Sequence, residues 1–100
     1  MVFARMHVLE TTPEQSERGL EIVRDQLLPW LRDSTGFRGL VRLSDREGAK
    51  TLVITLWADE DALRASADAG SRLSELTAET VGVTRKALEE YEVTLFDVDA

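Results

Sequence analysis

The chain has 100 residues, 43% of them hydrophobic, and a formal net charge of −7. This length suits one small core, so we expect residues 1–100 to form a single domain. The absence of cysteine excludes disulfides and thiolate metal sites, and a lone histidine excludes a multi-histidine metal site. The negative charge argues against nucleic acid and anionic membranes as partners. With no apolar leader and no apolar run of membrane length, the expected location is cytoplasmic.

Residues 2–10 alternate in a way that predicts the first strand. One face is wholly apolar and carries Val2, Ala4, Met6 and Val8. The other face is mixed and carries Phe3, Arg5, His7 and Leu9. Because arginine and histidine on a buried face need partners, the mixed face predicts either a polar cavity or specific hydrogen-bond partners.

A capping-box sequence beginning at Thr12 predicts a long helix that ends near Asp33. Its buried stripe is expected at Leu20, Val23, Leu27 and Leu31. Pro29 has no N–H group and should kink the last turn, and Gly36 is the stop signal after the helix.

Residues 37–44 predict a second strand, and its polar second face favours a position at the edge of a sheet. Residues 45–48 are typical of a hairpin turn into a third strand over residues 51–57, which is rich in β-branched side chains. Trp57 ends this strand. It is expected either to plug the rim of the core or to form the wall of a ligand pocket.

Asp59 is a good N-cap for a second helix. The inner stripe of this helix is expected at Ala62, Ser66, Ala69, Leu73 and Leu76, with a break at Gly70. The small side chains of its first half either pack closely on the sheet or leave room for a ligand, and Ser66 is therefore a candidate substrate contact. Residues 81–88 are expected to form a loop with a helical turn, and residues 90–98 the last strand.

The resulting order, β-α-β-β-α-β, predicts an α+β, ferredoxin-like fold with a four-stranded antiparallel sheet. Right-handed crossovers place both helices on one face of this sheet. The opposite face, which includes the apolar side of residues 2–8, is then uncovered. A second copy that packs its own sheet there would form a homodimer, and this is the simplest way to cover so apolar a surface.

Several features together resemble the antibiotic biosynthesis monooxygenase domain. These are the strand end Leu56-Trp57, the acidic helix cap that follows, the preceding long helix and the strand start Gly36-Phe37. The resemblance covers nearly the whole chain. It implies a dimeric α+β barrel, in agreement with the expected homodimer. Some members of the family are cofactor-independent oxygenases acting on aromatic polyketides, others degrade haem, and many have no known activity.

The resemblance carries over to individual residues only in part. Trp57 matches the strand-end tryptophan that lines the pocket of the family. His7 falls where the haem-degrading branch keeps an asparagine, and the histidine used by that branch falls near Ala67, where this chain has none. The quinone-forming oxygenases also use an asparagine, and this chain has no asparagine. We therefore expect no cofactor and no metal, with haem bound through His7 as the remaining exception.

The candidate catalytic residues are His7, Arg5 and Trp57. His7 could act as a base with a pKa near working pH, and Arg5 could stabilise a phenolate or enolate. Phe3 and Trp57 could stack on the substrate ring. The alternatives are a structural core histidine and an ion pair between Arg5 and a helix carboxylate. The first expected function is a monooxygenase for a small aromatic or quinol-like substrate. The second is a non-catalytic ligand-binding or accessory homodimer, and the third is a haem-binding or haem-degrading protein.

Overall fold

The structure, a computed structural model, describes residues 1–67, 82 and 84–99. Its elements are β1 (Phe3–Glu10), α1 (Pro13–Ile22), the π-helical turn η1 (Val23–Leu27), α2 (Leu28–Arg32), β2 (Phe37–Ser44), β3 (Lys50–Trp57) and β4 (Thr84–Glu92). Residues 60–67, which follow β3, form a further helix. None of the described helices is long and apolar enough to cross a membrane.

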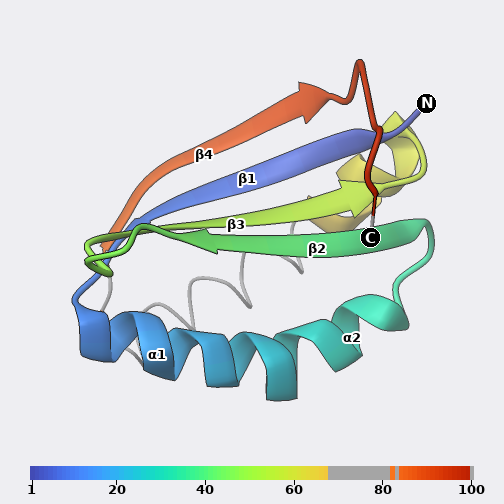
Figure 1. Ribbon diagram of the computed structural model, residues 1–100. Coiled ribbons are helices and arrows are strands. Elements are labelled where there is room, and N and C mark those ends of the chain that lie inside the picture. Colours follow the sequence, from blue (N-terminus) through green and yellow to red (C-terminus); the bar gives the residue numbers. More distant parts are fainter. Residues whose placement is uncertain (68–81, 83, 100) are drawn as a thin grey trace.

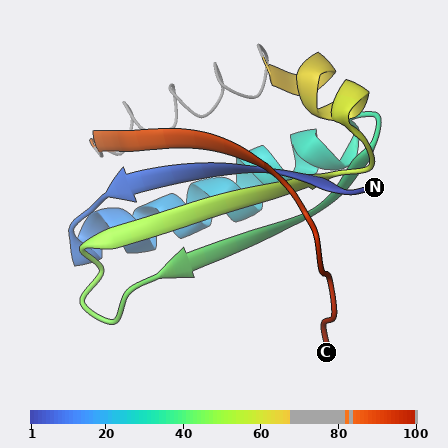
Figure 2. The ribbon, with the colours of Figure 1, turned by 90° about the horizontal axis from the view of Figure 1, so that it is seen from above.

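The four strands form one antiparallel sheet in the order β2-β3-β1-β4 (Figure 1). The expected ferredoxin-like α+β fold is confirmed, and β2 lies at an edge, as its polar face indicated. Viewed from above, α1 and α2 lie behind the sheet (Figure 2). Leu63, in the helix of residues 60–67, joins the same core cluster as Leu27 and Leu31, so this helix covers the same face.

The long helix begins as expected but contains a π-helical turn. The Oγ1 atom of Thr12 accepts a hydrogen bond from the backbone N–H of Gln15, and the Gln15 side chain caps the backbone of Thr12 in return. At η1, the N–H of Leu28 donates to the carbonyl of Val23, five residues earlier. The proline ring at position 29 clashes with a carbonyl four residues back in a regular helix, and the wider turn relieves this clash.

The extra residue in the π-turn also explains an error in the expected stripe. Val23, Leu27 and Leu31 are buried as expected, whereas Leu20 is 44% exposed. A stripe read at constant helical spacing assumes 3.6 residues per turn throughout. Because η1 widens the helix after Ile22, residues before and after it no longer share one line, and Leu20 faces outward.

The last strand lies earlier in the chain than expected. β4 spans Thr84–Glu92, so the loop expected over residues 81–88 is wrong for 84–88, and residues 93–99 lie outside any strand. The partner strand sets this limit. β1 begins at Phe3, which pairs with Glu92, and beyond that pair only the Val93 N–H bonds to the carbonyl of Val2. The segment after β4 then runs away from the sheet (Figure 2).

The second helix starts where the sequence predicted. The carboxylate of Asp59 accepts the N–H of Ala62 over 2.8 Å. Leu63 and Ser66 are buried, although the expected stripe did not include Leu63. The expected stripe positions Ala69, Leu73 and Leu76 and the expected break at Gly70 lie outside the described residues.

The two faces of β3 differ in burial. On the helix side, Thr51, Val53, Thr55 and Trp57 are all buried. On the other side, Leu52, Ile54 and Leu56 are only half-buried. The described helices lie behind the sheet, and none covers its opposite face (Figure 2). The core of the molecule therefore lies between the sheet and the helices, and the second face of the sheet is uncovered in the single chain.

Candidate functional site

The mixed face of β1 looks toward the helices, as its composition suggested. In the β1–β3 register, Arg5 pairs with Thr55 and His7 pairs with Val53. Arg5 is 2% exposed and His7 is 5% exposed, which is unusual burial for two such polar side chains. Both must therefore find partners or a polar space beneath the helices.

Trp57 is fully buried at the end of β3 and is held at two points. Its indole Nε1–H donates to the Oγ1 atom of Thr55 over 3.0 Å, in a buried hydrogen bond. The ring of Phe37 meets it edge-on, with ring centroids 5.5 Å apart at 69°. Phe3, the second expected stacking residue, is partly buried against the same core cluster. These contacts fix the orientation of the indole ring.

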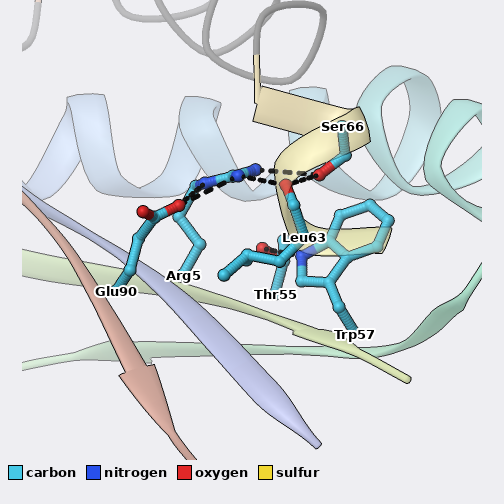
Figure 3. A network of polar contacts seen from close by, with 6 residues as sticks. All are labelled: Arg5, Thr55, Trp57, Leu63, Ser66 and Glu90. Atoms are coloured by element: carbon cyan, nitrogen blue, oxygen red, sulfur yellow. Dashed lines mark hydrogen bonds and ion pairs between the residues drawn. The ribbon is translucent and has the colours of Figure 1, made fainter. Parts of the chain in front are cut away.

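Arg5 ties β1 to β4 and to the second helix (Figure 3). Its Nη2 atom donates to the carbonyl oxygen of Leu63 over 2.6 Å, and Nη1 donates to the Oγ atom of Ser66 over 3.1 Å. Nε and Nη2 both donate to the Oε2 atom of Glu90, over 3.2 and 3.1 Å. The alternative for Arg5 expected an ion pair with a helix carboxylate. The carboxylate that pairs with Arg5 instead lies on a strand, β4. The guanidinium is a fixed positive charge.

His7 is buried, and its Nδ1 atom has no hydrogen-bond partner among the residues that the structure describes. Burial lowers its pKa to about 4, with further lowering from the positive charges of Arg85 and Arg5. The expectation of a pKa near working pH is therefore wrong. At neutral pH the imidazole is uncharged, so one ring nitrogen carries a lone pair that can accept a hydrogen bond.

A small hollow lies between the sheet and the long helix. Its lining residues are Arg5, His7, Leu27, Leu31, Val53, Thr55 and Trp57. It leaves about 10 Å³ for the centre of a water molecule, which is about the space that one water needs. The three expected catalytic residues therefore meet at one place. Phe3 and Ser66, the other candidate substrate contacts, do not line it.

Four lining residues were not singled out from the sequence as site residues. Val53 and Thr55 carried a signal, because they precede Trp57 at the spacing of two that places side chains on one face of a strand. Leu27 and Leu31 were expected only as core residues of the long helix. That these side chains enclose a space is a property of tertiary packing, which the sequence pattern does not encode.

The described residues offer no place for a metal or a haem. No group of three or more histidine, cysteine, aspartate or glutamate side chains in the described part of the chain could hold a metal ion. A porphyrin does not fit beside His7, because the hollow there takes about one water molecule. The one histidine that could ligate haem iron is thus enclosed by its neighbours.

No family model matches the chain. The chain is 29% identical over 93 residues to the uncharacterized protein Rv2557 of Mycobacterium tuberculosis, covering 93% of this chain and 41% of that protein. It is 31% identical over 68 residues to the uncharacterized protein Rv2558 of the same organism, covering 68% of this chain and 29% of that protein. The chain therefore spans less than half the length of the curated relatives it matches.

Solved structures share the fold at low sequence identity. A variant of SnoaB, a cofactor-independent oxygenase from Streptomyces nogalater, has a TM-score of 0.72 at 18% identity, with 95% of both chains covered. The monooxygenase ActVA-Orf6 of Streptomyces coelicolor, in complex with nanaomycin D, has a TM-score of 0.67 at 16% identity, covering 96% of this chain and 92% of that chain. The chain has the antibiotic biosynthesis monooxygenase fold.

The antibiotic biosynthesis monooxygenase fold carries more than one activity among these neighbours. The haem-degrading protein Rv3592 of Mycobacterium tuberculosis has a TM-score of 0.64 at 24% identity, covering 99% of this chain and all of that chain. The resemblance found in the sequence is thus confirmed for the fold. Activity has to be argued from the site residues of this chain.

Proposed function

We propose that the chain is a cofactor-independent monooxygenase that acts on a small hydroxylated aromatic or quinol-like molecule. The observation that carries the proposal is the Nδ1 atom of buried His7, which no described residue pairs, in a hollow bounded by Trp57 and Arg5. A buried polar atom without a partner costs free energy unless a ligand or a water molecule forms a hydrogen bond with it. We also propose that residues 1–100 act as one domain and that the protein is cytoplasmic.

The proposed chemistry needs no external reductant. The substrate hydroxyl donates a hydrogen bond to His7, which accepts its proton as dioxygen attacks, so the ring reacts with phenolate-like electron density. Dioxygen adds at a ring carbon that bears hydrogen, one oxygen atom stays there as a carbonyl, and the other leaves as water. The ring thus supplies all four electrons that reduce dioxygen, and a phenol becomes a quinone. The charges of Arg5 and Arg85 favour the phenolate, the same charges that lower the pKa of His7.

The size of the hollow favours a second candidate, a non-catalytic ligand-binding or accessory protein. The described residues leave space for a single oxygen atom beside the indole, so an aromatic ring requires Leu27 and Leu31 to move aside. A protein that binds a ligand without turning it over would keep the same polar contacts. The two candidates differ only in whether oxygen is consumed.

We further propose that two copies form a homodimer through the uncovered faces of their sheets. That face includes Met6, Ile54 and Val41, which lie side by side in the register of three neighbouring strands. The proposal is supported by apolar side chains that the single chain leaves exposed on this face, including Val41, Leu43 and Tyr91. Such a surface is characteristic of an interface. A monomer in sedimentation at micromolar concentration contradicts this proposal.

Oxygen uptake tests the choice between the first two candidates. We expect uptake with 1-naphthol at pH 7, an equimolar quinone-type product, and a loss of at least about 100-fold in rate on His7→Ala. Trp57→Phe should lower the rate as well. Glu60→Gln, at an exposed helix position, is the matched control and should keep the rate. Binding without uptake selects the non-catalytic candidate, and the absence of both contradicts the two proposals together.

A further inference from the structure

Among the described residues, the hydroxyl hydrogen of Thr55 has no acceptor. Its Oγ1 atom accepts the indole N–H of Trp57 over 3.0 Å. An indole nitrogen can only donate, so Thr55 has to turn a lone pair toward it and direct its own hydrogen elsewhere. No described residue offers an acceptor to that hydrogen within hydrogen-bond distance. The neighbouring Arg5 side chain carries donors only. Thr55 is 5% exposed, so bulk water does not supply the acceptor either.

His7 lines the same hollow as Thr55, and its Nδ1 atom can accept the hydrogen bond that a ligand hydroxyl donates. In the β1–β3 register His7 pairs with Val53, two residues before Thr55, so the two side chains are diagonal neighbours on one face of the sheet. Diagonal neighbours are about 7–8 Å apart at Cα, close enough for one oxygen atom to bridge their side chains. Both residues line the hollow, and the hollow takes about one water molecule.

We propose that this hollow is a subsite for one hydroxyl group, which accepts a hydrogen bond from Thr55 and donates one to His7 Nδ1. An alcohol or phenol oxygen can do both, whereas a carbonyl or an ether oxygen can only accept and leaves His7 unpaired. His7 then distinguishes a hydroxyl from a carbonyl or an ether, Thr55 positions the ligand oxygen, and Trp57 orients Thr55. The inference rests on the proposed function for the direction of the bond at Nδ1, because a base must present its lone pair to the substrate.

The subsite should bind the substrate of the proposed reaction more tightly than its product. The substrate hydroxyl satisfies both Thr55 and His7, and the quinone product satisfies only Thr55. A buried polar group left unpaired weakens binding, so the site holds the reduced molecule more tightly than its oxidised product. The same contacts would let a non-catalytic protein distinguish a phenol from a quinone or a methyl ether.

Binding of a matched pair of small probes, phenol and anisole, tests the inference without catalysis. We expect the intact protein to bind phenol at least about tenfold more tightly than anisole, since one buried hydrogen bond is worth about 1.4 kcal/mol or more. The preference comes from the bond that only phenol donates to His7, so His7→Leu should abolish most of it. Thr55→Val keeps the side-chain shape but removes the hydroxyl from which both oxygens accept, so it should weaken both probes by a similar factor, whereas Thr55→Ser keeps the hydroxyl and should retain both affinities.

The single histidine allows a second readout that needs no assignment. In ¹⁵N NMR, we expect the Nε2–H tautomer of His7 and a shift of the Nδ1 signal when phenol is added, smaller in Thr55→Val than in Thr55→Ser. A proton on Nδ1, equal affinities for phenol and anisole, or no binding of phenol overturns the inference. Phenol selectivity in a protein that consumes no oxygen with any hydroxyarene upholds the subsite and rejects the oxygenase.

Discussion

Arg5 reaches from β1 to the second helix and donates its Nη2 hydrogen to the carbonyl oxygen of Leu63 over 2.6 Å. The same guanidinium is paired with Glu90 on β4, so one buried cation joins three elements. This cation lies beside the hollow that His7 lines. The position of the helix over the candidate site therefore depends on a charge that is only 2% exposed.

Removal of the counter-ion of Arg5 should destabilise the fold. In Glu90→Gln the guanidinium stays buried but loses its negative partner, and we expect a loss of about 1–3 kcal/mol in the free energy of unfolding. Glu90 itself is half-exposed, which keeps the loss below that of a fully buried pair. Denaturant unfolding of the wild type and the variant gives the difference directly.

The matched control for this substitution is Glu60→Gln. Glu60 pairs with Arg64 on the surface of the second helix, and both side chains are more than half exposed. An exposed pair of this kind contributes about 0.5 kcal/mol or less. If Glu60→Gln cost as much as Glu90→Gln, burial of Arg5 would not be the cause.

Gly36 should not tolerate a side chain. Its φ angle is +81°, and a Cβ atom built there would fall 2.4 Å from the Cβ of Ala62 in the second helix. We expect Gly36→Ala to cost about 2–4 kcal/mol in unfolding free energy, from backbone strain plus the displacement of that helix. Gly19→Ala is the contrasting control, because Gly19 lies in α1 and its Cβ would meet only the end of the Arg42 side chain, at 3.4 Å. That variant should be neutral or gain up to about 1 kcal/mol.

The parts of the fold that the sequence predicted well depend on local chemistry. Thr12 and Asp59 cap helices, Gly36 adopts a positive φ angle, and the turn before β3 begins at Asp45, whose carboxylate accepts the N–H of Ala49. Each signal lies within four residues of the bond that it makes. The order of the elements follows from such signals, and with it the ferredoxin-like topology and the position of Trp57.

The parts that the sequence predicted poorly depend on distant partners. The end of β4 at Glu92 is set by the start of β1 at Phe3, which is far away in the chain. The low pKa of His7 comes first from burial and then from Arg85, which lies on another strand. The subsite residue Thr55 looked like an ordinary strand threonine, because its bond to Trp57 is invisible in the alternation of the strand.

His7 should make the stability of the protein depend on pH. Its pKa is about 4 in the folded state against 6.5 for an unperturbed histidine, so between these values the unfolded chain binds the extra proton. Stability therefore rises with pH across this window, and the folded state should lose about 3 kcal/mol between pH 7 and pH 4 from this residue alone. Unfolding curves of the wild type and of His7→Leu are measured at a series of pH values, and their difference gives the contribution of His7 to the free energy of unfolding.

The single histidine also provides a direct check on that prediction. The ring C–H signals of His7 in ¹H NMR should titrate near pH 4 in the folded protein and near 6.5 in denaturant. A folded-state midpoint near 6.5, or a pH dependence that is unchanged in His7→Leu, would show that the imidazole is not shielded from water as its 5% exposure implies.

A charge on the uncovered face of the sheet should break the proposed homodimer without unfolding the subunit. Ile54 is half-buried at the centre of that face, opposite Met6 and Val41, so Ile54→Glu would bury an unpaired carboxylate in the interface. We expect the dissociation constant to rise by at least about 100-fold, because an unpaired buried charge costs several kcal/mol. Ala65→Glu adds the same charge at an exposed position of the second helix and should leave the dimer intact. Light scattering over a concentration series measures both, and a dimer that survives Ile54→Glu would require a different interface.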